Sequence, residues 1–365
     1  MSLYLQHIDH VVGGVTHISR MELELEPGSF NVLLGRTLAG KTTLMRLMAG
    51  LEQPSQGKIF MAGKDVTGVS VRKRNVSMVY QQFINYPSLT VRDNIASPLK
   101  LAKTSKKEIE QRVGEIAEML RIEHLLDRYP QELSGGQQQR TAMGRALVKE
   151  ADLILFDEPL VNLDYKLREE LRDELRELFK ARNCIAVYAT TEPNEALALG
   201  GNTAVLHEGK LLQYGPTDQV YRRPNSRHSA EMFSEPPINI VPGTLNHAAI
   251  SFDPSLSFPC DSGLLNLAEG TYDFGVRASH ITLSPTSPSD IELPVKVEVA
   301  EISGSETFLH VSHERFPLVL HLAGIHEFHV NDPIKIYFPS HQLYAFDKQG
   351  STVYVPAGQG GNLNG

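Results

Sequence analysis

Three short segments of the sequence carry residue types that handle phosphate. The first fits the pattern G-x-x-x-x-G-K-[ST]: Gly35, Arg36, Thr37, Leu38, Ala39, Gly40, Lys41 and Thr42, with Thr43 directly after it. The second consists of Ser134, Gly135, Gly136 and Gln137. The third is an apolar run, 153–156, that ends in Asp157 and Glu158. Each segment needs particular neighbouring elements before its chemistry becomes credible.

The first segment has the neighbours that a phosphate-binding loop requires. Residues 30–34 form an apolar run typical of a strand, and 42–48 predict a helix that stops at Gly50. Backbone N–H groups and the helix N-terminus would surround phosphates with partial positive charge. Lys41 would reach the β- and γ-phosphates, and Thr42 would offer its hydroxyl to Mg²⁺. The alternative is a chance match in a glycine-containing turn, which the flanking elements argue against.

The acidic pair at the end of the apolar run predicts metal and water chemistry. Asp157 would hold Mg²⁺ or its bound water, and Glu158 would orient and polarise an attacking water. Adjacent acids are more often part of a surface loop or a helix cap. Here they end a strand predicted to be buried, and acids in such a place need a partner such as a metal.

The serine segment predicts a second anion site. A Ser cap, two glycines and a free helix N-terminus precede a predicted helix through Arg140, Ala142 and Leu147. Alone, this pattern indicates nothing beyond a capped helix. One nucleotide has no use for two such sites within a single fold. We therefore expect the serine segment of one subunit to close over the γ-phosphate held by another, as in an ATPase that binds ATP between two chains.

The rest of the chain predicts a layered α/β domain with a helical insertion and a second, all-β domain. Residues 84–150 contain an amphipathic helix that begins at a Ser105/Glu108 capping box, and a helix at about 166–181 separates the strand-like runs 153–156 and 184–189. Prolines punctuate 224–243, so the boundary is expected near 235, giving domains 1–235 and 236–365. Runs such as 295–299 and 334–338 read as strands of a small β-barrel. The tail 358–365 is expected to be disordered.

Composition excludes several classes of protein. The chain has 365 residues, a net charge of −8, 35 basic and 43 acidic residues, and 41% hydrophobic residues, which is ordinary for a soluble protein. No run is long enough to span a bilayer, and the first residues lack the basic and apolar regions of a signal peptide, so any membrane role is expected to come from a partner. Cys184 and Cys260 imply no disulfide framework. His326 and His329 lie three apart on a predicted strand and would face opposite sides, which argues against a shared metal.

The chain resembles ATPase subunits of ABC transporters, of the maltose-importer type that serves sugars and polyols. Beyond the segments above, the resemblance rests on Val79-Tyr80-Gln81, on residues 86–95, on Asn162-Leu163-Asp164, and on residues 275–280 and 301–307. It implies an α/β P-loop ABC ATPase domain with an inserted helical subdomain, followed by an OB-like (TOBE/MOP-type) domain. It also implies that Gln81 senses Mg²⁺ and the γ-phosphate, that Asp164 belongs to the D-loop near ATP, and that the segment after Gln81 carries the groove for a coupling helix.

The same resemblance implies the partners and the location. A second ATPase subunit, two integral membrane permease subunits and, indirectly, a periplasmic or extracellular solute-binding protein are expected, with the chain peripheral on the cytoplasmic side of the inner or plasma membrane. Sugars and polyols are the expected solutes. Glycerol is a candidate because importers of that type resemble this arrangement in using two different ATPase chains.

Four residues depart from the family pattern. Thr191 stands where the family has a histidine that contacts the γ-phosphate, and a threonine hydroxyl is shorter and carries no positive charge. His207 belongs to the next predicted strand and cannot replace it. Val12 stands where an aromatic residue stacks on adenine. Leu38 replaces a loop glycine, which would strain the loop if positive φ is needed there. Val161 replaces the D-loop serine.

These departures fall on the half of the site that this chain builds for itself and on its D-loop, whereas the serine segment is intact. We therefore expect weak binding or slow hydrolysis of ATP at its own P-loop, and pairing with a different ATPase chain. The alternatives are a homodimer that tolerates the threonine, a soluble ABC ATPase acting on nucleic acid or ribosomes, and a regulatory subunit that does not hydrolyse ATP. The acidic charge balance and the lack of a basic stripe argue against nucleic acid as a partner.

Overall fold

The computed structural model describes residues 2–82, 84–161, 163–253, 256–260, 263–314 and 316–356. The chain divides into two compact units, Met1–Thr217 and Asp218–Gly365. The division lies earlier in the chain than the boundary expected near 235. Asn162 of the predicted D-loop and the predicted disordered tail 358–365 lie outside the described residues.

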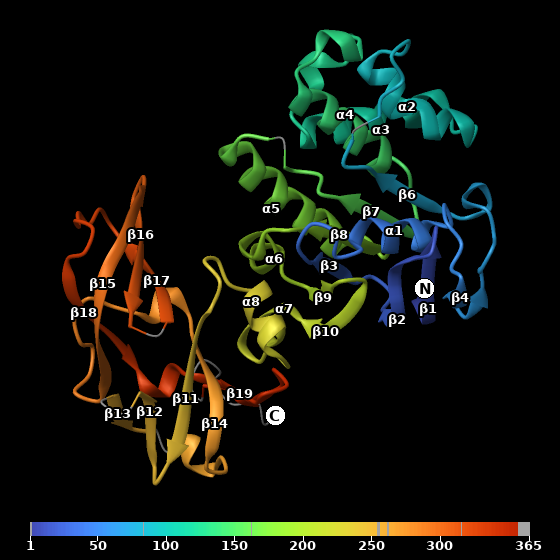
Figure 1. Ribbon diagram of the computed structural model, residues 1–365. Coiled ribbons are helices and arrows are strands. Elements are labelled where there is room, and N and C mark those ends of the chain that lie inside the picture. The colour runs from blue at the N-terminus through green and yellow to red at the C-terminus, as the bar shows by residue number, and fades with distance from the viewer. Residues whose placement is uncertain are drawn as a thin grey trace. The chain divides into compact units, whose positions relative to one another are not determined.

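The centre of the first unit is a mainly parallel six-stranded sheet (Figure 1). Its order is β10-β9-β3-β8-β7-β6, with only β10 antiparallel to its neighbour. The strands are β3 (Phe30–Leu34), β6 (Val76–Val79), β7 (Leu153–Asp157), β8 (Ile185–Thr190), β9 (Asn202–His207) and β10 (Lys210–Pro216). Strands β7 and β8 are buried at every position, as expected for parallel strands covered on both faces. The apolar runs predicted at 30–34, 153–156 and 184–189 are thus confirmed as strands.

A second, antiparallel sheet of the first unit has the order β2-β1-β4-β5. Its strands are β1 (Leu3–Val12), β2 (Val15–Leu25), β4 (Gln56–Met61) and β5 (Lys64–Asp65), and the β1–β2 hairpin turns through Gly13 and Gly14 at positive φ. Alternate residues of β1, such as Leu3, Leu5 and Ile8, are fully buried. They belong to one core with Leu44 and Met45 of helix α1 (Lys41–Ala49) and with strands β7 and β8. The phosphate-loop helix is therefore held between the two sheets.

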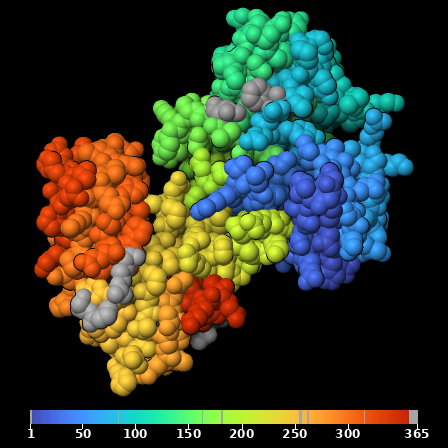
Figure 2. Space-filling model, viewed as in Figure 1, coloured from blue at the N-terminus to red at the C-terminus, as the bar shows by residue number. Residues whose placement is uncertain are grey.

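Helices α2 (Val91–Leu101), α3 (Lys106–Met119) and α4 (Gly135–Leu147) form the helical subdomain predicted within 84–150. They gather beyond the β6 edge of the sheet, at the top of the view in Figures 1 and 2. Ser105 caps α3 by accepting a hydrogen bond from Glu108 N at 3.3 Å. A Cβ on Gly144 would lie 3.1 Å from Ile95 and 3.3 Å from Ile116, so a glycine lets α4 approach both other helices closely.

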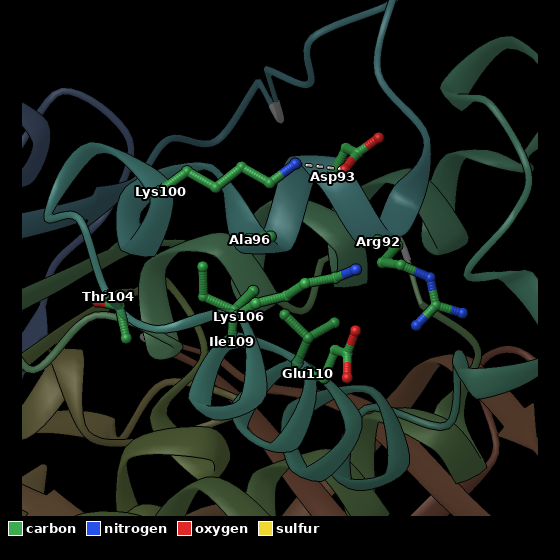
Figure 3. A pocket seen from close by; sticks show the side chains of 9 residues that line it. Arg92, Asp93, Ala96, Lys100, Thr104, Lys106, Ile109 and Glu110 are labelled. Atoms are coloured by element: carbon green, nitrogen blue, oxygen red, sulfur yellow. Dashed lines mark hydrogen bonds and ion pairs between the residues drawn. The ribbon is translucent and has the colours of Figure 1, made fainter.

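A hollow of about 360 Å³ opens between α2 and α3 (Figure 3). Ala96, Ile109 and Val113 supply its apolar lining, and charged side chains surround them. Across its edge Lys100 Nζ donates to Asp93 Oδ1 at 2.6 Å. This ion pair holds the pKa of Asp93 below its usual value.

Two further helices belong to the first unit, α5 (Tyr165–Ala181) and α6 (Pro193–Leu199). Leu171, Leu175 and Phe179 of α5 are buried, which confirms the apolar side predicted for this helix. The Phe179 ring lies 5.7 Å from that of Phe156, so α5 packs on β7. Short 3-10 helices complete the chain: Val71–Lys73, Glu123–Leu125, Pro130–Glu132, Leu264–Asn266, Ala278–His280 and Ser340–Gln342.

The second unit contains two antiparallel sheets, as expected for an OB-like domain. The sheet with order β13-β12-β11-β14-β19-β20 consists of β11 (Asn239–Asn246), β12 (Ala249–Asp253), β13 (Leu256–Pro259), β14 (Gly270–Val276), β19 (Tyr344–Phe346) and β20 (Thr352–Tyr354). The sheet with order β17-β16-β15-β18 consists of β15 (Asp290–Ser303), β16 (Glu306–His313), β17 (Phe316–Ala323) and β18 (Pro333–Pro339). Both contribute to one hydrophobic core.

Buried Arg277 explains why the second unit begins before the predicted boundary. Its guanidinium donates to Phe233 O at 3.1 Å and Tyr221 O at 2.6 Å, and lies 3.9 Å from the centre of the Tyr221 ring. These contacts attach helices α7 (Thr217–Arg222) and α8 (Arg227–Met232) to the β strands. The positions of prolines in the sequence do not reveal these contacts of Arg277.

One prediction about the second unit is wrong. Residues 325–329, which include His326 and His329, are not in a strand, so strand alternation does not separate these histidines. His326 Nε2 lies 2.9 Å from Ala323 O, and His329 Nδ1 lies 3.6 Å from Asp332 Oδ2. In the first unit, His207 ends β9, as predicted. Among the described residues, no helix is long and apolar enough to cross a membrane.

Candidate active site

The phosphate loop joins β3 to α1, as the sequence predicted. Gly40 is the N-cap of α1 and has φ 98°, and a Cβ on Gly35 would lie 2.7 Å from Leu206 O, so both glycines are needed. Gly35 N donates to Thr190 O at 3.3 Å, which ties the loop to the end of β8. Arg36, Thr37 and Leu38 are exposed on the loop, Ala39 is buried, and Thr43 is partly buried in the first turn of α1.

Leu38 occupies a backbone conformation that suits glycine. Its φ is 69°, in the left-handed region, and its side chain is 94% exposed. The strain expected for a leucine at this position is therefore present in the structure, with no burial of the side chain to offset it.

Lys41 is a buried cation at the base of the loop. Its Nζ donates to Gly35 O at 2.7 Å and Arg36 O at 3.3 Å, and lies 3.3 Å from Glu158 Oε1. Burial lowers the pKa of Lys41, and the nearby carboxylate of Glu158 opposes that effect. The loop carbonyls hold the ammonium in place beneath the backbone N–H groups, where a phosphate would bind.

Thr42 and Asp157, the two residues expected to hold Mg²⁺, contact each other. Thr42 Oγ1 donates to Asp157 Oδ2 at 2.8 Å. Burial raises the pKa of Asp157, and the Thr42 hydroxyl works against this rise. A hydroxyl and a carboxylate oxygen at this separation are the hard oxygen donors that Mg²⁺ prefers. A divalent ion would also favour the charged form of this buried acid, so the residues present fit Mg²⁺.

Glu158 lies at the centre of the site. Gln81 Nε2 donates to Glu158 Oε2 at 3.1 Å, and Lys41 approaches the other carboxylate oxygen. Glu158 N donates to Ala189 O at 3.1 Å, and the residue has φ 49°, an uncommon conformation for glutamate. Backbone strain of this kind concentrates at functional sites. The structure thus brings together Lys41, Gln81 and Glu158, three residues of the expected site.

The switch segment after β8 is fixed by a buried acid that sequence reasoning missed. Glu195 of α6 accepts hydrogen bonds from Tyr188 Oη at 2.6 Å and from Thr190 Oγ1. Thr190 Oγ1 in turn accepts from Glu192 N at 3.0 Å, while Thr191 is exposed. Burial raises the pKa of Glu195. An acid placed on the buried side of a short helix is the only sequence signal that would have pointed to it.

At the start of α4, Ser134 and Gln137 of the serine segment form hydrogen bonds with each other. Ser134 N donates to Gln137 Oε1 at 2.9 Å, and Gln137 N donates to Ser134 Oγ at 3.4 Å, a reciprocal capping box. Ser134 and Gly135 are exposed, and Gly136 and Gln137 are partly so. The segment is therefore an exposed, capped helix N-terminus.

Helix α4 is also tied to the segment that follows Gln81. Asn85 Nδ2 donates to Gln138 O at 2.8 Å, and the Arg145 guanidinium donates to Ile84 O and lies 4.9 Å from the centre of the Tyr86 ring. The side chains of Ile84 and Tyr86 are 58% and 48% exposed. This apolar, exposed segment is held to the serine-bearing helix by a contact that sequence reasoning missed.

Three residues singled out from the sequence remain: Asp164, Val161 and Val12. Asp164 caps α5 by accepting from Leu167 N at 3.0 Å. Val161 is 46% exposed, and Val12 is 53% exposed at the end of β1.

Comparison with known proteins gives the family. The sequence model of the family described as ABC transporter matches residues 18–161. The sn-glycerol-3-phosphate import ATP-binding protein UgpC of Salmonella typhi is 36% identical over 348 residues, 94% of this chain and 97% of that protein. Proteins with the same description are 35% identical over 346 residues in Brucella abortus (strain 2308), covering 93% and 95%, and 37% over 339 residues in Rhizobium etli, covering 92% and 94%.

A solved structure agrees with this assignment. The dimeric post-hydrolysis structure of the ATP-binding cassette MJ0796 bound to ADP and Pi matches with a TM-score of 0.54 and 26% identity, over 59% of this chain and 98% of that one. The overlap with relatives along nearly the whole chain, together with the geometry of Lys41, Asp157 and Glu158, leads to one conclusion. The chain belongs to the ABC transporter family, as one of its ATP-binding proteins.

Proposed function

We propose that this ABC ATPase is the energy-coupling subunit of an importer for a sugar, a polyol or a polyol phosphate ester. The observation that carries the proposal is the convergence of Lys41, Gln81 and Glu158 beside the Thr42–Asp157 pair. The names of the relatives, which are import ATP-binding proteins for sn-glycerol-3-phosphate, support import as the process and a polyol phosphate as the solute.

The proposed chemistry follows from the positions of these side chains. ATP binds with its phosphates on the loop 35–42, where Lys41 meets the γ-phosphate. Glu158 accepts a hydrogen bond from the attacking water and polarises it, and Gln81 holds the Glu158 carboxylate in place. Thr42 and Asp157 would hold Mg²⁺, which would neutralise charge at the phosphates.

A second ATPase chain completes the site in this proposal. The free, capped N-terminus at Ser134 is suited to a γ-phosphate presented by another subunit. Its helix α4 is tied through Arg145 and Asn85 to the exposed segment with Ile84 and Tyr86. That segment is where a membrane permease subunit would dock, on the cytoplasmic side of the membrane. Closure over ATP would thereby move the permease contact, and a solute-binding protein would deliver the solute from outside.

The pair is asymmetric in our proposal. Thr191 is exposed at the switch position and offers only a short hydroxyl, and Leu38 strains the phosphate loop. The Ser134 segment, by contrast, keeps the family pattern. This chain then hydrolyses ATP slowly at its own loop and completes a fast site on a non-identical ATPase. Losing one positioned contact to a transition-state oxygen costs about two to three orders of magnitude in rate.

The experiment that tests the assembly is purification of the tagged protein from its native membrane, followed by identification of its partners. A second, different ATPase together with two membrane proteins is the expected result. Recovery with membrane proteins but without another ATPase means a homodimer, and the asymmetry is then wrong. Recovery without membrane proteins would overturn the importer proposal itself.

The solute is tested in the same complex. Reconstituted in vesicles with its solute-binding protein, the complex should accumulate radiolabelled glycerol 3-phosphate, glycerol or maltose in an ATP-dependent way. Omission of ATP controls for leakage, because a passive leak does not depend on ATP. Uptake of none of these solutes would exclude the proposed solute class while leaving the ATPase chemistry intact.

A further inference from the structure

Two loops of the site follow neighbouring strands. Strands β7 and β8 are parallel, and Asp157 pairs with Ala189 at their ends. Glu158 comes directly after β7, and Thr191 comes directly after β8. In the proposed function the attacking water is held at Glu158, beside the switch position. The rate of hydrolysis therefore depends on how these two loops are placed relative to each other.

One guanidinium joins the two loops. Arg168 lies in the first turn of α5, and its side chain is 25% exposed. Its Nη1 donates to both carboxylate oxygens of Glu192, at 3.0 and 3.1 Å. Its Nη2 donates to Val161 O at 3.4 Å and to Leu163 O at 3.5 Å. Arg168 therefore holds the switch segment with one nitrogen and the loop between β7 and α5 with the other.

The side chain of Glu192 serves this contact rather than its own helix. Glu192 is the N-cap residue of α6, but its side chain makes no capping hydrogen bond. Its backbone N–H donates to Thr190 Oγ1 at 3.0 Å, and Thr190 donates to the buried carboxylate of Glu195. Thr191 thus lies between two residues that are each held by a side chain of another element. Glu195 of α6 holds one of them, and Arg168 of α5 holds the other.

The contact uses a property that arginine has and lysine lacks. A guanidinium presents its N–H groups in a rigid planar fork, whereas a lysine ammonium is a compact point charge. The fork of Arg168 holds a carboxylate on one side and two backbone carbonyls on the other. Arg172, one turn further along α5, has a different role: its guanidinium lies 3.7 Å from Glu169 of the same helix. The two arginines share a helix and a charge but not this bridge.

We propose that Arg168 is a positioning residue for hydrolysis at this chain's own phosphate loop. Through Glu192 it fixes the switch segment against the loop that carries Glu158, and this sets the place of the attacking water between them. The proposal rests on the ATPase function above and deepens it. The acceptors of Arg168 lie outside the phosphate loop 35–42. Loss of the bridge therefore lowers the rate of hydrolysis and leaves ATP affinity unchanged.

The test measures hydrolysis and binding separately. Hydrolysis is followed in single turnovers of the membrane complex, with any partner ATPase carrying a disabled phosphate-loop lysine. The dissociation constant of Mg²⁺-ATP is measured on the full-length chain alone. Arg168→Ala should lower the single-turnover rate constant by about ten- to a hundredfold, as expected for a misplacement of about 1 Å, without changing the dissociation constant.

Two further variants separate the bridge from the charge. Arg168→Lys keeps the positive charge, but one ammonium does not hold the carboxylate and both carbonyls, so it should restore at most part of the rate. Arg172→Ala is the matched control, because it removes the same charge from the same helix. It should change neither the rate constant nor the dissociation constant.

A double-mutant cycle tests whether Arg168 acts through Glu192. Glu192→Ala removes the other end of the bridge, so it should lower the rate constant as much as Arg168→Ala does. The double variant should then be no slower than either single variant, because both remove the same contact. Losses that multiply in the double variant would show two independent effects and would overturn the proposal.

Three other results would also overturn it. Arg168→Ala could hydrolyse ATP at the wild-type rate, Arg168→Lys could do so, or Arg168→Ala could lose ATP affinity in proportion to its rate, which would indicate a general disturbance of the fold. Failure of the ATPase function itself looks different, because the wild-type chain would then hydrolyse no ATP in single turnovers.

Discussion

Lys41 Nζ lies 3.3 Å from Glu158 Oε1. The cation of the phosphate loop is therefore paired with the carboxylate of the residue that directly follows β7. The two groups have opposite relations to ATP: the ammonium attracts the γ-phosphate, and the carboxylate repels it. Burial lowers the pKa of Lys41, and the carboxylate of Glu158 opposes this effect by favouring the charged ammonium. Phosphate binding must compete with this ion pair.

Replacing Glu158 by Gln should separate binding from turnover. The neutral amide leaves Lys41 free for the γ-phosphate and removes the repulsion, so ATP should bind about three- to tenfold more tightly, equivalent to roughly 0.7 to 1.4 kcal/mol. Hydrolysis at this loop should be lost, because an amide cannot polarise water as a carboxylate does. Titration with a fluorescent ATP analogue measures the first effect, and phosphate release measures the second.

The control is Glu192→Gln, which removes a carboxylate from the neighbouring switch segment. Glu192 pairs with Arg168 at 3.0 Å rather than with Lys41, so ATP affinity should not rise. Weaker ATP binding by Glu158→Gln than by wild type would contradict the proposed competition between Glu158 and phosphate.

Thr191→His should raise hydrolysis at this chain's own loop. The imidazole is longer than the threonine hydroxyl and can donate a hydrogen bond to the γ-phosphate or the attacking water. Restoring one such contact should raise kcat by about two orders of magnitude, as expected for a single positioned donor. The measurement is ATP turnover in the membrane complex, with any partner ATPase carrying a disabled phosphate-loop lysine.

Thr191→Ser is the matched control, because it keeps a hydroxyl of similar reach and should leave kcat close to that of wild type. If Thr191→His does not change kcat while ATP binding is retained, then another group positions the water, and the asymmetric pair loses its main support.

The sequence predicts those parts of this site that depend on local pattern. The strand 30–34, the helix that ends at Gly50 and the acid at the end of β7 all follow from periodicity and capping. The link between Glu195 and Thr190 depends on how α6 packs against β8. Likewise, the approach of Arg145 to Tyr86 joins segments far apart in sequence. The β-bulge at His17 lies where His10 pairs with Ile18 and Val11 with Thr16; it depends on strand register, which composition does not encode.

Glu195→Gln should alter the pH dependence of stability. Burial raises the pKa of Glu195 above its ordinary value, so the folded chain keeps this proton to a higher pH than the unfolded chain. The stability contribution is therefore fully present below the unfolded pKa of about 4.3 and is lost as pH rises through the folded pKa. Glutamine does not titrate, so the variant should lack this loss. Urea unfolding midpoints across a pH series measure the difference.

Tyr188→Phe tests the same hydrogen-bond network by changing the pKa of Glu195 instead of replacing the acid. The Tyr188 hydroxyl donates to Glu195 Oε1 and favours the ionised form of the acid. Removing it should raise the pKa of Glu195 further. The pH range over which stability is lost should then extend to higher pH. Identical pH profiles for wild type, Glu195→Gln and Tyr188→Phe would show that this acid does not titrate in the range that its burial indicates.

Leu38→Gly should stabilise the chain, because Leu38 has φ 69° and buries almost nothing. Relief of the left-handed strain favours glycine by about 1–2 kcal/mol. The greater freedom of glycine in the unfolded chain offsets about 0.4–1 kcal/mol of this. A net gain of roughly 0.5–1 kcal/mol in the free energy of unfolding is therefore expected, measured by urea unfolding of the full chain. Leu38→Ala keeps a Cβ at positive φ and should show no such gain. Equal stability of the two variants would mean that the loop relaxes around its strained residue, and Leu38 would then give no support to the expectation of weak nucleotide binding at this loop.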